Sequence, residues 1–393
     1  MILCPGPNVR AAGRNGGSVK GIKTAIVGCG VISDVYMRSF KENFSIIEPV
    51  ACADLDESKM NELAQRYQIK PMCYDDILKD ESIEMIINLT SPKAHYSLSK
   101  QAILSGKHVY SEKMMAVTYE EGKELCELAL EHHVRFGAAP DTFLGGGIQT
   151  ARYAVERGLV GKVLSGVLSL TRDYGVFGEN LPHLFGRGGS VLYDMGGYYL
   201  TAVCSILGGV SRIASFGMRT EDVHKVTRVG SPLFGKDIPL EEDNVITAIL
   251  EFQNKALITL HLNSGTIINE SYHLELYGDK GILRMGDPNT FCGKVILEKA
   301  QNEQVILPFT HGFQRESRGL GAAEMAWSIL EGRPHRASME MALHVMEIMH
   351  GITTSADSGK TYRMKTKFKQ PKPLPEGFIG EGFWAAKEES ALL

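Results

Sequence analysis

The 393-residue sequence lacks several features that would place it in other classes of protein. It contains no run of about 18 apolar residues, so it predicts no transmembrane helix. Its first twenty residues are interrupted by prolines and glycines and hold no apolar segment of signal-peptide length. The seven cysteines are scattered and form no C-x-x-C pair, which is typical of reduced thiols rather than of disulfides or zinc ligands.

Strong charge of either sign is also missing, because the formal net charge is −4. Neither nucleic acid nor a membrane surface is therefore expected as a partner. Hydrophobic residues make up 44% and charged residues 22%, and the length allows two domains with a large core. We expect a cytoplasmic α/β protein with four parts: a flexible N-terminal arm (1–21), two domains (22–143 and 144–366) and an extended C-terminal tail (367–393).

In the first domain, short β-rich runs alternate with amphipathic helical segments. This alternation predicts a parallel, doubly wound sheet of the Rossmann type. The predicted strands are 24–28, 50–54, 71–75, 84–90, 108–112 and 134–140, and the predicted helices are 34–43, 58–68, 94–106 and 118–133.

The pattern changes in the second domain to longer strands, several of them joined by hairpin turns. It predicts a large, open, mostly antiparallel or mixed sheet with helices on one face. The predicted strands are 163–172, 211–219, 245–252, 256–263, 273–279 and 281–285, and the predicted helices are 146–159, 193–208, 321–332 and 338–356. Phe383 and Trp384 are expected to anchor the tail on this or a neighbouring subunit.

Residues 24–33 (TAIVGCGVIS) join a short strand to a helix through a glycine-rich turn. Gly28 allows a tight turn, Gly30 leaves room for a pyrophosphate beside the backbone, and the small Ser33 permits close helix–strand packing. The free N–H groups at the helix start, around Val31 and Ile32, suit an anion. A tight turn needs glycine for steric reasons as well, so this motif alone does not decide between the two interpretations.

The following strand ends in Asp54, which strengthens the dinucleotide interpretation, because a carboxylate there fits the adenosine ribose hydroxyls. Leu55 and Asp56 follow it, with no arginine beside them. Two carboxylates would repel a 2′-phosphate, so NAD is favoured over NADP.

Two later strand ends supply further candidates for cofactor contacts. Thr90, Ser91 and Pro92 stand where a nicotinamide ribose would lie, and His95 follows them at a helix start, where a purely structural hydrogen bond is the alternative. The next strand ends in Ser111, Glu112 and Lys113, which places Lys113 in the predicted crevice as an electrophilic or acid–base group.

Asp194 and Tyr198 in the stretch GGSVLYDMGGYYL are four residues apart, so they share one face if the segment is helical. The surrounding glycines leave room for a ligand. The alternative interpretation is a glycine-loosened helix start, with Asp194 near the N-cap and the tyrosines in the core.

Residues near the domain junction and after the first strand of the second domain are candidates for contact with a substrate. They are Asp141, Phe143, Arg172, Tyr174 and His183, and each is equally compatible with a solvated loop. His344, Glu347 and His350 have helical spacing, but no further cluster of ligands supports a metal, so none is expected.

Together these segments resemble the glucose–fructose oxidoreductase/inositol dehydrogenase (Gfo/Idh/MocA) family over about residues 23–361. The resemblance rests on the motifs GCGVIS, ADLD, LTSPKAH, GKHVYSEKM, APDTFLGGGIQTAR, GGSVLYDMGGYYL and EGRPHRASMEMALHVMEIM. It implies a Rossmann domain, a second domain whose open sheet mediates dimers or tetramers, and a sugar-like substrate held above the nicotinamide.

The resemblance also implies roles for individual residues. Lys113 matches the lysine of the family's Glu-Lys-Pro signature, with Met114 in place of the proline. Asp194 and Tyr198 match an aspartate followed four residues later by histidine. Tyrosine at that position resembles the branch typified by glucose–fructose oxidoreductase and dimeric dihydrodiol dehydrogenase.

The leading hypothesis is an NAD-dependent oxidoreductase that acts on a secondary hydroxyl of a sugar, cyclitol or glycoside, with ring position 3 as one candidate. Lys113, Asp194 and Tyr198 would be catalytic. One alternative is an oxidation–elimination–reduction cycle with retained NAD, as in a glycosidase or lyase. Another is a non-catalytic NAD-binding regulator on the same fold.

Overall fold

The structure, a computed structural model, describes residues 21–179, 181–267 and 270–378. Nearly all of the predicted N-terminal arm, and the expected anchors Phe383 and Trp384, lie outside these ranges. The described chain forms a six-stranded sheet, called here the Rossmann sheet, and a nine-stranded sheet, called the large sheet. A separate two-stranded sheet joins β9 (Val223–Lys225) and β10 (Asp237–Pro239).

The Rossmann sheet has the order β3-β2-β1-β4-β5-β6, and every neighbouring pair is parallel. This confirms the predicted doubly wound fold. Its strands are β1 (Ile22–Val27), β2 (Ile47–Ala53), β3 (Lys70–Pro71), β4 (Met85–Asn88), β5 (His108–Ser111) and β6 (Phe136–Ala138). Its helices are α1 (Val31–Asn43), α2 (Glu57–Tyr67), α3 (Tyr74–Lys79), α4 (Pro92–Leu104) and α5 (Tyr119–Glu131).

Local signals explain where these helices begin. Asp56 accepts the N–H groups of the first turn of α2, and Thr118 and Glu121 form a capping box at the start of α5. The predicted strand over 71–75 is wrong beyond residue 71. Asp75 and Asp76 instead lie in the first turn of α3, where acidic side chains favour a helix N-terminus.

The large sheet has the order β16-β15-β14-β13-β7-β12-β11-β8-β17, and all pairs are antiparallel except β7 with β12. This confirms the predicted mixed, mostly antiparallel sheet. Its strands are β7 (Val163–Arg172), β8 (Val210–Met218), β11 (Val245–Phe252), β12 (Leu257–Asn263), β13 (Glu270–Gly278), β14 (Ile282–Arg284), β15 (Ile296–Glu298), β16 (Gln304–Ile306) and β17 (Tyr362–Arg363). The sequence pattern missed β9, β10, β15, β16 and β17, which have only two or three residues each and so carry almost no periodicity.

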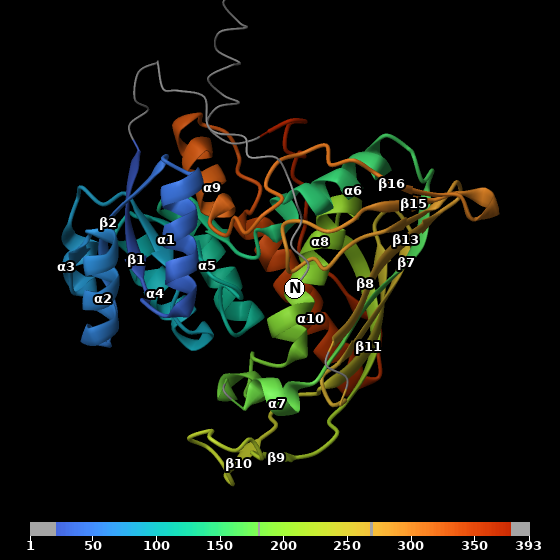
Figure 1. Cartoon of the computed structure of the whole chain (residues 1–393), viewed down its shortest axis with the longest axis horizontal. Coiled ribbons are helices and arrows are strands. Elements are labelled where there is room, and N and C mark those ends of the chain that lie inside the picture. Colours follow the sequence, from blue (N-terminus) through green and yellow to red (C-terminus); the bar gives the residue numbers. More distant parts are fainter. Residues whose placement is uncertain (1–20, 180, 268–269, 379–393) are drawn as a thin grey trace, which may run out of the picture.

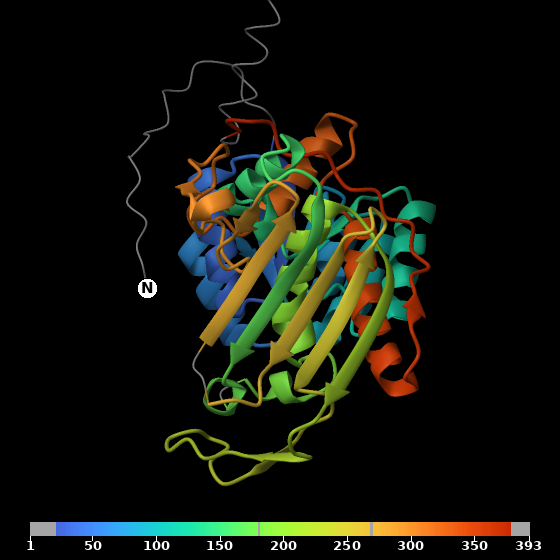
Figure 2. The same cartoon turned by 90° about the vertical axis from the view of Figure 1, so that its right-hand side faces the viewer.

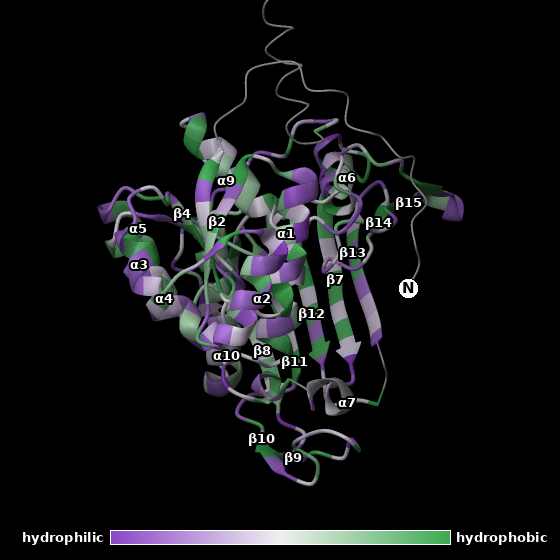
Figure 3. Ribbon diagram, turned by 60° about the vertical axis from the view of Figure 1, so that its left-hand side comes forward, coloured by the Kyte–Doolittle hydropathy of each residue, from purple (hydrophilic) through white to green (hydrophobic). Residues whose placement is uncertain are grey.

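The helices of the second half are arranged around the large sheet. They are α6 (Gly146–Glu156), α7 (Tyr174–Gly178), α8 (Gly197–Leu207), α9 (Leu320–Leu330) and α10 (Met339–Ser358). Figure 1 shows α8 and α10 between the two sheets. In Figure 2 the other face of the large sheet is turned to the viewer, and no described helix crosses it. The strands alternate between hydrophobic and hydrophilic residues in Figure 3, as expected for a sheet covered on one face.

Helix α9 belongs by sequence to the second half but packs on the first. The Trp327 ring lies edge-on to Phe44, with centroids 6.2 Å apart. The backbone N–H of Ala138, at the end of β6, donates to the Ala337 carbonyl at 3.2 Å. The Rossmann half is therefore completed by a segment that follows the large sheet in the chain.

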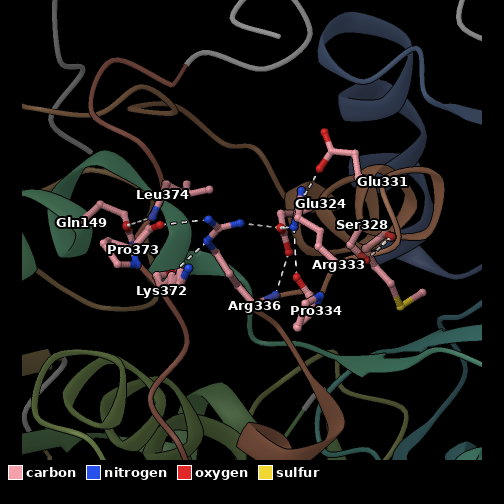
Figure 4. A network of polar contacts seen from close by, with 11 residues as sticks. Gln149, Glu324, Ser328, Glu331, Arg333, Pro334, Arg336, Lys372, Pro373 and Leu374 are labelled. Carbon is pink, nitrogen blue, oxygen red and sulfur yellow. Dashed lines mark hydrogen bonds and ion pairs between the residues drawn. The ribbon is translucent and has the colours of Figure 1, made fainter. Parts of the chain in front are cut away.

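A polar network shown in Figure 4 fastens the segment 372–374 to this region. The fully buried Glu324 carboxylate is paired with Arg333 and accepts from the Arg336 side chain at 2.6 Å. Arg336 also donates to two backbone carbonyls of the segment, each at 2.9 Å. Gln149 accepts a backbone N–H of the same segment at 3.0 Å. Because each charged or amide group has a partner, burial of this network is tolerated.

Within the described ranges, no helix combines the length and apolar character needed to cross a bilayer. The same ranges contain no group of three or more His, Cys, Asp or Glu side chains placed to hold a metal ion. His344 instead accepts the backbone N–H of Val210 at 3.0 Å.

Candidate active site

The glycine-rich turn has the shape that a pyrophosphate needs. Gly28 has a φ of +97°, and a Cβ atom there would lie 2.6 Å from the carbonyl carbon of Leu89, so only glycine fits. At Gly30, in contrast, a Cβ atom would meet no atom of the described chain within 4 Å. Ser33 is fully buried, and its hydroxyl donates to the Gly30 carbonyl at 2.6 Å. The turn therefore opens at Gly30, directly before the N–H groups of the first turn of α1.

The adenosine end of the predicted cofactor site is built around Asp54. Its carboxylate accepts the N–H groups of Cys29 at 2.6 Å and Asp56 at 2.8 Å, which ties the end of β2 to the glycine turn. Val31 and Leu55 are apolar and yet 92% and 104% exposed. Exposed apolar side chains beside an anchored carboxylate match an adenine ring and its ribose hydroxyls. These residues therefore fit NAD.

Thr90, Ser91 and Pro92 occupy the turn between β4 and α4, next to Gly28. A Cβ atom at Gly28 would lie 2.7 Å from the Thr90 nitrogen, so the two turns touch. The Thr90 hydroxyl donates to Asn88 at 2.7 Å. Ser91 is exposed and makes no side-chain cap to α4. This turn borders the predicted nicotinamide end of the site.

The side chains of His95 and Glu112 make structural contacts, and for His95 this is the alternative that the sequence analysis gave. His95 is 1% exposed, and its ring nitrogens face the carbonyls of Met114 at 2.6 Å and Thr90 at 2.9 Å. The Glu112 carboxylate accepts the Tyr36 hydroxyl at 2.8 Å and the backbone N–H of Lys113 at 2.9 Å. We correct the predicted direct cofactor contacts accordingly: both side chains hold the loops that carry Thr90 and Lys113.

Lys113 and Asp194 form the centre of the candidate site. The Lys113 Nζ lies 2.8 Å from the Asp194 carboxylate and 2.7 Å from its backbone carbonyl. The other carboxylate oxygen of Asp194 accepts the Tyr174 hydroxyl at 2.6 Å. The peptide bond between Lys113 and Met114 is cis. Two segments distant in sequence, the end of β5 and the turn before α8, are thus brought together by one ion pair.

Tyr198 completes this group but does not lie on a plain helical face with Asp194. Residues Leu192–Gly196 form a π-helical turn, and α8 begins only at Gly197. The wider turn changes the register that the four-residue spacing assumed. Tyr198 nevertheless reaches the pair, because the Lys113 Nζ lies 5.0 Å from the centre of its ring.

Charges within this group shift its ionisation. Burial alone would lower the pKa of the Lys113 ammonium, but the Asp194 carboxylate outweighs it and raises that pKa. Burial alone would raise the pKa of Asp194, and Lys113 instead holds it below its usual range. Burial raises the pKa of the Tyr198 phenol, while Lys113 and Arg318 oppose that rise. At neutral pH the site therefore holds an ion pair beside a protonated phenol.

Arg318 is a residue that the sequence analysis missed. Its guanidinium interacts with the Tyr198 phenol, donates to Asn289 Oδ1 at 2.8 Å and pairs with Glu316. Arg318 lies just before α9 (Leu320–Leu330), in a loop to which the sequence analysis assigned no role. No local pattern connects an arginine there to a tyrosine 120 positions earlier (318 minus 198).

Two of the predicted substrate contacts are wrong. Asp141 is 1% exposed, and one carboxylate oxygen accepts the N–H groups of Gly319 and Gly321, each at 2.9 Å, at the start of α9. Burial raises the pKa of Asp141 to about 7. Phe143 is 2% exposed and lies in the core. Both positions at the domain junction serve packing between the halves.

The other three predicted substrate residues lie at the candidate site. Tyr174 bonds Asp194 directly, and Arg172 donates to the Met195 sulfur at 3.7 Å. His183 is exposed as a whole residue, but its imidazole is partly shielded from water, and this shielding lowers its pKa. The negative charge of Asp194 opposes that shift, and the positive charge of Lys113 adds to it. Arg172, the last residue of β7, and Tyr174, two residues later, thus approach the segment that carries Asp194 from the end of this strand.

Comparisons with known proteins agree with this architecture. Residues 22–139 match the model of the GFO/IDH/MocA oxidoreductase family, described as an NAD-binding Rossmann fold, and residues 148–284 match that family's C-terminal domain. The chain belongs to the GFO/IDH/MocA oxidoreductase family. The predicted family and the NAD cofactor are thereby confirmed.

Individual relatives are more distant. An uncharacterised oxidoreductase of Schizosaccharomyces pombe is 33% identical over 147 residues, which cover 36% of this chain and 40% of that protein. A second fission-yeast oxidoreductase is matched over 52% of its length, so the chain spans about half or less of these two relatives. D-glucoside 3-dehydrogenase of Escherichia coli is 23% identical over 86% of this chain and 96% of its own.

Among solved structures, levoglucosan dehydrogenase in complex with NADH and levoglucosan has a TM-score of 0.75 at 16% identity. The match covers 88% of this chain and 100% of that one. An oxidoreductase from Agrobacterium radiobacter, in complex with NAD+, L-tartaric acid and magnesium, has a TM-score of 0.72 at 17% identity over 88% and 98%. At these identities the likeness establishes the fold alone.

Asp54 should determine the choice between NAD and NADP. We expect calorimetric titration to give at least about tenfold tighter binding of NAD, since a like-charge contact costs several kcal/mol. Asp54→Ser should narrow this difference. Glu84→Gln is the matched control, because Glu84 precedes β4 and accepts the N–H of Lys23, at the opposite end of β1 from the glycine turn. Equal affinities for the two cofactors in the unmodified protein would contradict this prediction.

Proposed function

We propose that the protein is an NAD-dependent dehydrogenase that oxidises a secondary hydroxyl of a sugar, cyclitol or glycoside. The observation that carries this proposal is the Lys113 ammonium, paired with Asp194 at 2.8 Å and placed over the Tyr198 ring. This group follows β5, at the same end of the Rossmann sheet as the glycine turn and the Thr90 turn. The names of two matched proteins, D-glucoside 3-dehydrogenase and levoglucosan dehydrogenase, support the same substrate class.

The residues at the site suit the two charge movements of such a reaction. NAD, when bound, supplies the acceptor for the hydride that leaves the carbinol carbon as its C–H bond breaks. The Tyr198 phenolate oxygen takes the hydroxyl proton in the oxidation, and the phenol returns it in the reverse direction. Lys113 stabilises the negative charge that develops on the substrate oxygen, and Asp194 and Tyr174 hold Lys113 in place.

The activity is tested by supplying NAD and a panel of sugars, cyclitols and glycosides and measuring NADH formation by absorbance. We expect NADH with at least one neutral polyhydroxylated substrate, and NADH formation at least about 100-fold slower with Lys113→Met. If no member of the panel yields NADH while NAD binds normally, the proposed activity is wrong. Release of a cleaved aglycone with no net NADH would favour the elimination cycle with retained NAD.

We further propose that the open face of the large sheet joins two or more copies of the chain. Neighbouring strands β8, β11 and β12 place apolar side chains on that face, among them Phe216 at 81%, Ile249 at 51% and Leu257 at 50% exposure. Large exposed apolar side chains gathered on one face of a sheet are typical of interaction sites.

Ile249→Lys should therefore lower the molecular mass in solution, measured by light scattering, because a charge would be buried at the interface. Leu130→Lys is the control, since Leu130 is a 63% exposed leucine of α5, outside the large sheet. A monomeric wild-type protein, or an unchanged mass in Ile249→Lys, would rule out this interface.

A further inference from the structure

On the face of the large sheet that is turned toward α8, two buried rows of side chains end in polar groups. The buried leucines of β7 are followed by Arg172, and those of β13 are preceded by Tyr272 and Glu270. Side chains two residues apart point to the same face of a strand, so all three continue the inner rows. Arg172 lies directly opposite Glu270 in the antiparallel pair of β7 and β13.

These side chains are close to the candidate catalytic group. Arg172 Nε lies 3.4 Å from a Glu270 carboxylate oxygen, and its Nη1 lies 3.7 Å from the sulfur of Met195, the residue after Asp194. Unlike the buried leucines of the same strand, Tyr272 is 41% exposed and the Glu270 side chain 39% exposed. An aromatic ring and an ion pair are thus accessible where the apolar core ends.

A second carboxylate and a buried hydroxyl face the same place. Asp287 lies shortly after the end of β14. The residue directly after β14, Met285, still runs beside β13, because its N–H donates to the Leu274 carbonyl at 2.9 Å. The Tyr199 side chain is fully buried, and its hydroxyl has no hydrogen-bond partner among the described residues. Burial raises the pKa of that phenol, and so do the negative charges of Asp287 and Glu270.

We propose that Tyr272, Glu270, Asp287, Arg172 and Tyr199 form a subsite for a neutral polyhydroxylated ring next to the carbon that is oxidised. The Tyr272 ring offers an apolar surface to the ring face. Glu270 and Asp287 accept substrate hydroxyls, Arg172 donates to a substrate oxygen, and the Tyr199 hydroxyl gains the partner it lacks. Two carboxylates facing one arginine disfavour a ligand with a phosphate or carboxylate at this end. This subsite rests on the proposed function, because it adjoins the proposed catalytic group.

The subsite is tested by binding in the full-length protein with NADH present, so that no turnover is needed. The probes are methyl β-D-glucopyranoside and its uronate, titrated by ligand-observed NMR. We expect the wild type to bind the neutral probe at least about tenfold more tightly, and Glu270→Gln to narrow that ratio. Tyr272→Ala should weaken both probes by about tenfold, whereas Tyr277→Ala, at an odd-numbered position of the same strand and so on its other face, should not.

The other possible results would overturn the subsite, or would distinguish its failure from failure of the proposed function. Equal binding of the two probes by the wild type, no binding of either, or wild-type behaviour of both Tyr272→Ala and Glu270→Gln would overturn the subsite. If the wild type oxidises a sugar and Tyr272→Ala does so with an unchanged KM, the subsite fails and the proposed function stands. If the variants change binding as expected but no sugar yields NADH, the proposed function fails and the subsite stands.

Discussion

Replacing Lys113 with methionine is expected to lower turnover by at least about 100-fold, because the ammonium would no longer stabilise charge in the transition state. Lys113 is 16% exposed at its side chain and pairs with the 20% exposed Asp194. The variant should still bind NAD, since the glycine turn and Asp54 do not contact Lys113. The measurements are kcat with a sugar substrate and a calorimetric titration with NAD.

Lys107→Met is the matched control for this variant. Lys107 is also a buried lysine, but its ammonium donates to the carbonyls of Asp80 and Ile83, each at 2.8 Å, away from the site. Its loss should lower the melting temperature, because a buried and a partly buried carbonyl lose their donor, while turnover per folded molecule is retained. Near-normal turnover in Lys113→Met, or an equal loss in both variants, would place the chemistry elsewhere.

Tyr198→Phe should lower the rate of hydride transfer by about 100-fold or more, the usual contribution of a general acid–base group. Burial keeps the pKa of this phenol above its ordinary value despite Lys113 and Arg318. In the oxidation direction only the ionised phenol accepts a proton, so the wild-type rate should rise with pH as far as that pKa. In the reduction direction the protonated phenol is the donor, so the rate should fall above it. The variant should lose this limb of the pH–rate profile in both directions.

Tyr199→Phe is the control for Tyr198→Phe, because it removes the hydroxyl of the neighbouring tyrosine in α8. Its hydroxyl should contribute to KM and not to the chemical step, so we expect a rise in KM of a few-fold at most, with the pH limb retained. Single-turnover rates at saturating substrate are the decisive measurement. If they fall equally in both variants, or only in Tyr199→Phe, the assignment of Tyr198 is wrong.

The parts of this protein that depend on neighbouring residues in sequence could be predicted from the sequence. The glycine turn, the carboxylate at Asp54 and the lysine after β5 each follow a strand that periodicity identifies. Asp141 could not be placed in this way, because its environment depends on the start of α9, which lies far along the chain. Arg318 and Asp287 were missed for the same reason, since each reaches the candidate site from a loop that has no periodicity of its own.

The packing of α9 on the Rossmann half limits where the chain can be divided into separable parts. A cut after residue 143, the predicted domain boundary, would separate the nucleotide-binding half from the rest of the chain. That cut would remove Trp327 from Phe44 and the donors of Gly319 and Gly321 from the Asp141 carboxylate. The chain returns to its first half after completing the large sheet, so the two halves are not independent modules. Exchanging one half with that of a relative should work only if residues 317–340 travel with the nucleotide-binding part.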